Sequence, residues 1–316
     1  MNRQQLKGHL AMSGANVMWG LMSPLSKYIM ASGLISSLLL TDLRIIGAAA
    51  AFWIASFFAP HEHVPNKDMI RLFFAAMLGI VFNQGSFIMG LGMTSPIDAS
   101  IITTTTPIIV MILAAIFLKE PVTGLKVLGI FFGALGALVL ILSGNTASSA
   151  GSAESNIWGN LLCFLAQCSY SCYFVLYKDL IGRYSALTLM KWMFTYASIA
   201  IIPFSYSELA SAQWTSMSAV EIGGSAFVVL GATFLSYLLI PIGQHVLRPT
   251  VACMYNYVQP IVACLVAVLL GVAGLGWMKI VAIALVFIGV YMVTQSKSRA
   301  QLEAMQKTQT DPEQKA

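Results

Sequence analysis

Polar and aromatic residues recur at helical spacing in two segments that lie 151 residues apart. Spacings of i, i+3, i+7 and i+11 put four residues of the first segment on one helix face, namely Asn16, Trp19, Ser23 and Lys27. Their counterparts in the second segment are Gln167, Tyr170, Phe174 and Lys178. An amide one turn from an aromatic ring offers hydrogen bonds and a stacking surface, which favours a cavity wall. The alternative is that these groups only bond neighbouring helices.

A second matched pair is centred on Pro107 and Pro260, each near the middle of an apolar segment. Proline frees the carbonyl four residues earlier, and lipid cannot satisfy a free carbonyl, so both turns must face protein or a watery cavity. We expect both prolines to act as hinges. Polar residues that collect on these faces are expected to bind solute: Thr103, Thr106, Asn256 and Gln259. The alternative is that the prolines are packing kinks and the threonines bond their own helix.

Three further residues, Asn83, Gln84 and Tyr237, are expected to complete the ring of binding groups. Ionisable residues are rare within the apolar segments, and the deepest are Lys27, Asp42 and Arg44. Asp42 and Arg44 are two positions apart and cannot pair along one helix face, so a Lys27–Asp42 contact is expected. These charges could gate the cavity. We favour the alternative that Lys27 and Arg44 extend to the membrane interface.

The sequence gives no sign of catalysis, because it lacks His-Glu-x-x-His, Gly-x-Ser-x-Gly and Cys-x-x-Cys motifs and paired carboxylates within apolar segments. His61 and His63 lie in a polar loop without further ligands, so no metal site and no cofactor are expected. The net charge of +5 is spread over loops, and nucleic acid is therefore not an expected partner.

The composition identifies the solvent as a lipid bilayer. The chain is 58% hydrophobic and 9% charged, where soluble domains carry about 25% charged residues. Its apolar runs are about 20 residues long, the length of a transmembrane helix. They predict ten helices near 9–31, 36–58, 70–92, 97–118, 124–143, 157–181, 186–207, 221–243, 250–271 and 274–295.

The chain contains an internal repeat. An offset of 153 superposes Ala99 on Ala252, Pro107 on Pro260 and Gly136 on Gly289, and the first half of the unit repeats at an offset of 151. The repeats occupy residues 8–143 and 157–295, joined by a Gly/Ser/Ala-rich linker (144–156) and followed by a polar tail (296–316).

Lysine and arginine residues gather in alternate loops, which places both termini in the cytoplasm. Because five helices per repeat is an odd number, the second repeat must be upside down relative to the first. The sequence therefore predicts an all-α integral membrane protein whose ten transmembrane helices form two inverted five-helix repeats.

Several motifs carry a resemblance to a known family: Leu43-Arg44, Thr94-Ser95-Pro96 leading to Thr106-Pro107, Phe117-Leu118-Lys119-Glu120-Pro121, and the series Gly129, Gly133 and Gly136. With the repeat, they resemble the EamA-type carriers of the drug/metabolite transporter superfamily over nearly the whole chain. The second repeat departs from this pattern, because residues 272–274 are Val-Ala-Gly and lack the acidic residue. The resemblance implies a ten-helix fold and solute transport across the inner membrane, often export of metabolites or amino acids.

We expect a multi-pass carrier in the cell inner membrane that moves an amino acid or similar small metabolite, as an exporter, by alternating access. The absence of a midplane carboxylate weakens the case for a cation antiporter. The alternatives are a multidrug or nucleobase-type exporter of the same fold, and a membrane scaffold without transport. The scaffold alternative draws on the small-residue face at Gly129-x-x-x-Gly133 and on Gly47 to Ala51, which would allow close helix contacts. The partners left open are the solute, the lipid bilayer and a second copy of the chain. A cavity lined by both matched helix pairs would separate a carrier from a scaffold.

Overall fold

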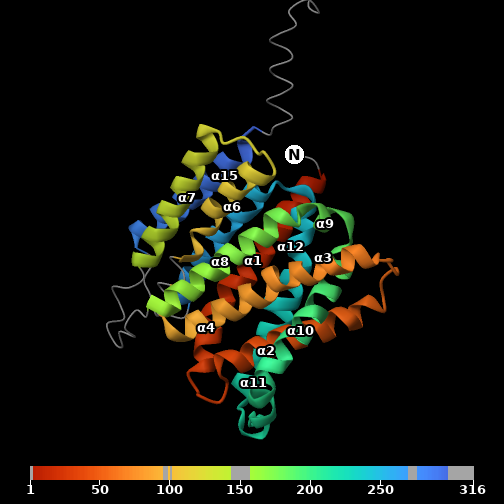
Figure 1. Ribbon diagram of the computed structural model, residues 1–316. Coiled ribbons are helices and arrows are strands. Elements are labelled where there is room, and N and C mark those ends of the chain that lie inside the picture. Colours follow the sequence, from red (N-terminus) through yellow and green to blue (C-terminus); the bar gives the residue numbers. More distant parts are fainter. Residues whose placement is uncertain (1–2, 95–98, 100–101, 144–156, 270–275, 298–316) are drawn as a thin grey trace, which may run out of the picture.

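The computed structural model describes residues 3–94, 99, 102–143, 157–269 and 276–297 (Figure 1). This part of the chain is helical and contains no strand. The first repeat holds α1 (Arg3–Met30), α2 (Ser37–Ser56), α3 (Asn66–Ala76), α4 (Ser86–Met93), α6 (Thr106–Phe117) and α7 (Gly124–Ser143). The second holds α8 (Ile157–Leu176), α9 (Lys178–Arg183), α10 (Ala186–Ser211), α11 (Ala219–Val229), α12 (Ser236–Val246), α13 (Pro249–Cys253), α14 (Val258–Leu269) and α15 (Trp277–Gln295). The predicted linker and most of the predicted tail lie outside the described residues.

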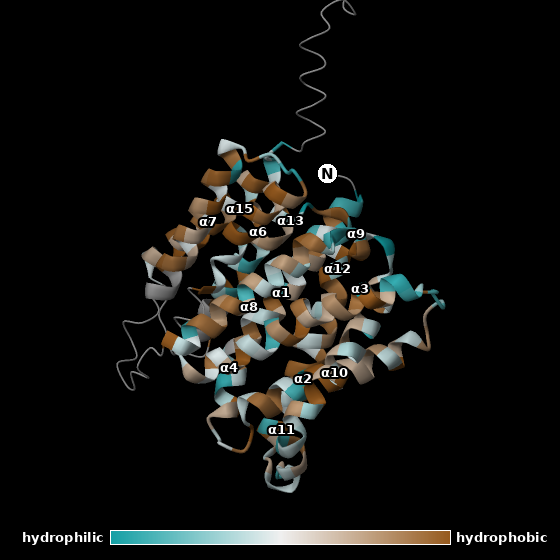
Figure 2. Ribbon diagram, in the orientation of Figure 1, coloured by the Kyte–Doolittle hydropathy of each residue, from teal (hydrophilic) through white to brown (hydrophobic). Residues whose placement is uncertain are grey.

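The membrane fold that the sequence predicts is confirmed. Helix occurs within each of the ten predicted segments. Among the described residues, five stretches are long and apolar enough to cross a membrane by themselves: Ser37–Ser56, Asn66–Met93, Ile157–Leu176, Ala186–Ser211 and Ala219–Val246. Figure 2 shows strongly hydrophobic colours on helices such as α7 and α15, and hydrophilic colours on α9 and nearby loops.

Two long helices contain a π-helical segment at matching positions. In the first repeat, η1 (Met77–Gly85) joins α3 to α4, and in the second, η4 (Leu230–Leu235) joins α11 to α12. Their first residues are separated by the repeat offset of 153. π-Helical turns are rare and are frequently found at functional sites, so their repetition makes the third helix of each repeat a candidate part of the site.

The main contacts between helices of the two repeats have counterparts in which the repeats have swapped roles. The first helix of each repeat packs on the third helix of the other, as α1 does on α12 and α8 on α4. It also packs on the fourth helix of the other, as α1 does on α14 and α8 on α6. The second helices, α2 and α10, pack together, and so do the fifth, α7 and α15. The two repeats are thus related by an internal pseudo-twofold axis.

Contacts at the start of α1 define one end of the bundle, which we call the N-terminal end. A Cβ on Gly8 would lie 3.3 Å from Cγ of Leu247, just beyond α12. Lys178, which follows α8, donates from Nζ to the carbonyl of the same Leu247 at 3.2 Å. The start of α1 and the end of α8 therefore meet at one place.

The opposite end shows the reverse arrangement. Near the end of α1, Lys27 donates from Nζ to the carbonyl of Leu91 in α4 at 2.9 Å. Near the start of α8, a Cβ on Gly159 would lie 3.0 Å from the carbonyl oxygen of Gly90, next to Leu91. Helices α1 and α8 hence run antiparallel, which confirms that the repeats are inverted.

Glycines of α7, including Gly129 of the small-residue face proposed for assembly contacts, pack against α15 of the same chain. Helices α7 and α15 cross so closely that a Cβ on Gly129 would lie 2.8 Å from the carbonyl oxygen of Gly289. A Cβ on Gly136 would lie 2.6 Å from the carbonyl oxygen of Ala282. These small residues permit close approach of the fifth helices of the two repeats.

Ion pairs join the two repeats at the N-terminal end. Arg183 of α9 places Nη1 2.6 Å from Oδ2 of Asp68 in α3, and the Tyr184 hydroxyl donates to the same oxygen at 2.6 Å. Arg71 binds both carboxylate oxygens of Asp179, at 2.9 and 2.8 Å. The hydrogen bond with Asp68 raises the pKa of the Arg183 guanidinium.

The equivalent contact at the opposite end has no ion pair. The repeat offsets of 153 and 151 carry Asp68 to Glu221 and relate Arg183 to Ser32. Ser32 lies next to the Glu221 carboxylate, so a hydroxyl stands where the N-terminal end has a guanidinium. The pseudo-symmetry is thus broken by charge, with an ion pair at the N-terminal end and a hydroxyl–carboxylate contact at the other.

Candidate functional site

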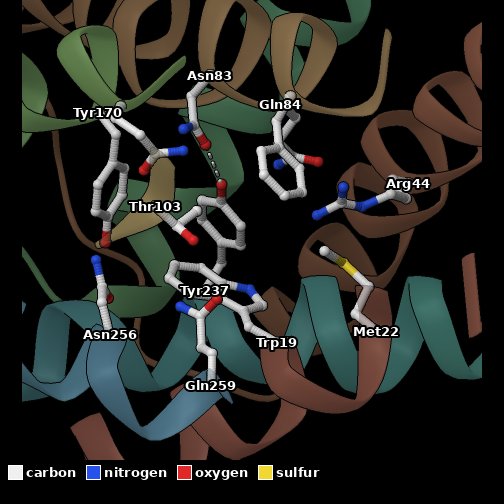
Figure 3. Close-up of a pocket in the computed structure, with 12 residues that line it drawn as sticks. Trp19, Met22, Arg44, Asn83, Gln84, Thr103, Tyr170, Tyr237, Asn256 and Gln259 are labelled. Atoms are coloured by element: carbon white, nitrogen blue, oxygen red, sulfur yellow. Dashed lines mark hydrogen bonds between the residues drawn. The ribbon is translucent and has the colours of Figure 1, made fainter. Parts of the chain in front are cut away.

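A cavity lies among helices of both repeats (Figure 3). It encloses about 510 Å³ of space, counting the part that is open to the outside. The part of this space that a water-sized molecule can occupy is about 60 Å³, enough for a few ordered water molecules, so binding of a solute requires the lining to move apart. Its lining consists of Trp19, Met22, Arg44, Asn83, Gln84, Phe87, Thr103, Gln167, Tyr170, Tyr237, Asn256 and Gln259.

Most of the residues that the sequence singled out for solute binding reach this cavity, although they come from distant parts of the chain. Asn16 and Thr106 lie just behind the lining and bond residues within it. Ser23 belongs to α1, but its side chain is outside the described part of the structure. Met22 and Phe87 were missed, because apolar residues in an apolar helix give no signal of their own. Solute binding by all of these residues stays a prediction.

Trp19 stands in the aromatic wall of the cavity. Its ring meets those of Tyr170 and Tyr237 edge to face, with centroids 5.9 and 5.8 Å apart. Its indole nitrogen donates to the carbonyl of Ala232 at 2.9 Å, and Ala232 belongs to η4. The hydrogen bond and the two ring contacts fix the indole, which can then present a rigid apolar surface to a solute.

The π-helical segments supply polar groups to the same place. Asn83 and Gln84 belong to η1, and Asn83 donates from Nδ2 to the carbonyl of Ala166 at 3.1 Å. The hydroxyl of Tyr237, which is two residues beyond the end of η4, lies 3.4 Å from Oδ1 of Asn83. Nothing in the amphipathic pattern distinguishes a π turn from an α turn, so the sequence analysis did not find these segments.

Two polar pairs, each joining a lining residue to a residue behind it, are related by the pseudo-symmetry. Gln259 of α14 donates from Nε2 to Oδ1 of Asn16 in α1 at 2.9 Å. In the other pair, Oγ1 of Thr106 in α6 lies 2.7 Å from Oε1 of Gln167 in α8. The repeat offsets carry Asn16 to Gln167 and Thr106 to Gln259. These bonds between helices match the alternative raised from the sequence, and they position the amides at the cavity.

The backbone is interrupted before each of the two prolines. Residues 104–105 form a turn before α6, where Pro107 occupies the first turn, and η5 (Met254–Tyr257) precedes Pro260. The expected continuous helix over 97–118 is therefore wrong, since Pro107 lies where a helix restarts and its missing donor is tolerated. The Thr103 carbonyl, expected to be free, lies 2.8 Å from the Thr106 hydroxyl oxygen, whose single proton it shares with Oε1 of Gln167. A hinge role for both prolines stays a prediction.

The sequence favoured an Arg44 side chain that extends to the membrane interface, and this prediction is wrong. Its side chain is buried, with 2% of the residue exposed, and Figure 3 shows the guanidinium directed into the cavity. Its Nε donates to Oγ1 of Thr233 in η4 at 3.0 Å, while Nη1 has no hydrogen-bond partner among the described residues. The hydroxyl of a π-helical segment, which the sequence pattern does not reveal, holds the arginine inside.

Lys27 and Asp42 do not form the contact expected from the sequence, because Lys27 donates to the Leu91 carbonyl instead. Asp42 is fully buried in α2 and faces Ser205 and Glu208 of α10. Neither carboxylate oxygen has a hydrogen-bond partner of ordinary geometry in the described part of the chain. The two groups thus occupy separate environments, and a gating role for either stays a prediction.

The lining can bind a molecule by hydrogen bonds, stacking and one positive charge. Within the described residues no group of three or more His, Cys, Asp and Glu side chains could hold a metal ion. A helical membrane protein with inverted repeats around such a cavity has the architecture of a membrane transporter.

The comparison with known proteins gives the family. The EamA-like transporter family model matches residues 6–142 and 157–295. The chain therefore belongs to the EamA-like transporter family, whose members are membrane transporters.

Relatives agree with this assignment without naming a solute. An "Uncharacterized transporter" of Archaeoglobus fulgidus is 25% identical over 279 residues, 88% of this chain and 95% of the relative. The "Uncharacterized inner membrane transporter YicL" of Salmonella typhimurium is 23% identical over 268 residues, 84% of this chain and 87% of the relative. A solved crystal structure shares the fold, with a TM-score of 0.74 at 17% identity over 91% of this chain and 96% of the other.

Proposed function

We propose that this protein is a carrier that moves a small organic solute, an amino acid or similar metabolite, through the central cavity by alternating access. The observation that carries the proposal is the pair of matched contacts, Asn16–Gln259 and Thr106–Gln167, behind one cavity. Each repeat supplies a first helix to one pair and a fourth helix to the other. Movement of one repeat against the other would therefore change the cavity from both sides.

Inverted symmetry provides the mechanism. If the two repeats exchange conformations, a pathway open at one end of the bundle becomes a pathway open at the other. The ion pairs of Asp68 and Arg71 hold the N-terminal end together in this structure. Opening at that end requires these pairs to separate, whereas opening at the other end breaks the weaker Ser32–Glu221 contact.

We further propose that the protein lies in the cell inner membrane with both termini in the cytoplasm, because lysines and arginines gather in the loops on that side. The N-terminal end of the bundle is then cytoplasmic. An exporter would load its solute when that end is open. Dimer formation remains an expectation to be tested by the mass of the purified protein in detergent.

The two alternatives are less well supported by the site. A multidrug exporter of cations needs an acidic group, and the lining residues include an arginine and no carboxylate. A scaffold without transport does not require a cavity lined by matched residues of both repeats. The glycines proposed for assembly contacts are occupied by the α7–α15 crossing.

Transport by the purified protein in lipid vesicles tests the proposal. Cells with and without the gene would first be compared for metabolites, and the differing solutes would be offered to the vesicles. We expect uptake above that of empty vesicles, reduced about tenfold or more by Trp19→Ala, which removes the aromatic wall. Trp214→Ala is the matched control, because Trp214 is half exposed outside the cavity. Uptake equal to that of empty vesicles for every solute would reject a carrier function.

A further inference from the structure

Arg44 carries a positive charge into the cavity without a counter-charge. No ion pair involves Arg44 in the part of the chain that the structure describes. Thr233 fixes Nε of Arg44, and the Thr233 hydroxyl itself donates to the carbonyl of Val228 at 2.8 Å. Burial of an unpaired guanidinium is costly. The buried and unpaired guanidinium of Arg44 is therefore a candidate binding site for an anion.

The inverted architecture does not require a charge at this position. The repeat offsets of 151 to 153 relate Arg44 to the stretch from Thr195 to Ala197 in α10, none of which is charged. The second repeat therefore forms the equivalent helix without an arginine. This asymmetry indicates that the role of Arg44 is to bind a molecule in the cavity and not to stabilise the packing of the repeats.

Other buried polar groups of the lining also lack partners. The side-chain amide of Gln84 lies near the Tyr237 hydroxyl, but neither this amide nor the hydroxyl of Tyr170 makes a hydrogen bond of ordinary geometry among the described residues. In Figure 3, Arg44 and Met22 lie on one side of the cavity, and Tyr170 and Asn256 lie on the opposite side. Buried groups of this kind are uncommon unless a ligand or ordered water satisfies them.

From this arrangement we propose that the solute is a small organic acid whose carboxylate binds Arg44. This conclusion rests on the carrier function proposed above and narrows its solute from amino acids and similar metabolites to acids without an amine. The planar guanidinium matches a carboxylate in geometry and charge. The body of the acid lies against the rings of Trp19 and Tyr237, and a second polar group reaches Tyr170. An ammonium group meets no acidic residue among the lining residues and is repelled by Arg44. A carboxylate without a neighbouring amine is therefore preferred over a zwitterion.

Calorimetric titration of the full-length protein in detergent tests the charge class. The probes are benzoate, phenylacetate, 3-phenylpropionate and 4-methylpentanoate, each compared with its primary amide, and phenylalanine as the zwitterion. We expect at least one acid to bind about tenfold or more tightly than its amide and than phenylalanine. Arg44→Gln should lower the affinity for that acid by roughly 10- to 100-fold, which corresponds to the loss of a hydrogen-bonded charge pair. The affinity for the amide should be unchanged.

Three further variants separate binding from folding. Arg248→Gln is the matched control, because Arg248 binds the carbonyl of Ser296 away from the cavity, and it should keep the preference for the acid. Arg44→Lys retains the positive charge without the planar guanidinium and should still prefer the acid over the amide, at lower affinity. This variant tests the proposal even if Arg44→Gln does not fold. Thr233→Val removes the hydrogen bond that Arg44 Nε donates to the Thr233 hydroxyl, and it should lower the affinity for acids and not for amides.

The outcomes distinguish this proposal from the carrier function. If amides or phenylalanine bind as tightly as the acids, and Arg44→Gln changes nothing, the acid proposal is wrong and the cavity still binds solute. If no probe binds while vesicles transport another solute in a Trp19-dependent way, the acid proposal again fails alone. If neither binding nor transport is found, both proposals fall.

Discussion

Polar residues around the cavity are paired across the repeats and still have capacity for a solute. Asn16 accepts from Gln259, and its own amide nitrogen donates to the Met12 carbonyl at 2.8 Å. An amide has two donors and two acceptor lone pairs, so neither bond exhausts either residue. The two interpretations open from the sequence, bonding between helices and lining a cavity, are therefore compatible.

Asp42 is the acidic residue best placed to carry a proton during transport. It is buried against α10, where the Ser36 hydroxyl donates to the neighbouring Glu208 at 2.8 Å. We predict that Asp42→Asn abolishes accumulation of solute driven by a pH gradient and preserves exchange of labelled for unlabelled solute without a gradient. Both rates can be measured in the same vesicles. Unaltered gradient-driven accumulation would show that Asp42 carries no proton.

The helix faces and prolines at the cavity could be predicted from the sequence, whereas the π-helical turns and the burial of Arg44 could not. The Pro107 and Pro260 segments and the faces of Asn16 and Gln167 were found because both the helical period and the repeat offset mark them. The π turns were not, because hydropathy does not encode a single extra residue in a helical turn. The burial of Arg44 was not predicted either, since it depends on Thr233, 189 positions away along the chain.

The crossing of α7 and α15 gives a prediction about stability. Gly136→Ala should lower the free energy of unfolding by about 1–3 kcal/mol, because the new Cβ meets the Ala282 carbonyl and forces the helices apart. Gly124→Ala, at the start of α7, has nothing within 4 Å of the new Cβ and should be neutral or stabilising. Thermal unfolding of both variants in detergent provides the measurement. Equal stability of the two would mean that the close crossing is not formed.

The ion pairs at the N-terminal end give a prediction about conformation. Asp68→Asn weakens the contact with Arg183 and should favour the state that is open at that end. A cysteine introduced at Gln244, which is buried in α12 near that end, should then react faster with a soluble thiol reagent. Glu221→Gln, the pseudo-symmetric change, should not accelerate this reaction. A faster reaction in both variants, or in neither, would contradict a lock at the N-terminal end.

The whole molecule is a duplicated unit whose copies differ in charge. Packing follows the pseudo-twofold axis, as α1–α12 matches α8–α4. Charge does not follow it, because Arg44 and Arg183 have uncharged counterparts. For the carrier that we propose, equal packing would allow the two repeats to exchange conformations, and unequal charge would favour one end as the closed end and one side of the cavity as the site for an anion.

Access to the cavity from the two sides of the membrane is the most direct test of this account. A single cysteine at Gln84, in a variant without the native cysteines, would be exposed to a membrane-impermeant maleimide from each side of oriented vesicles. Alternating access predicts labelling from either side, with Asp68→Asn increasing the rate from the N-terminal side and decreasing it from the other. Labelling from one side alone, or from neither, would contradict a pathway that passes through this cavity.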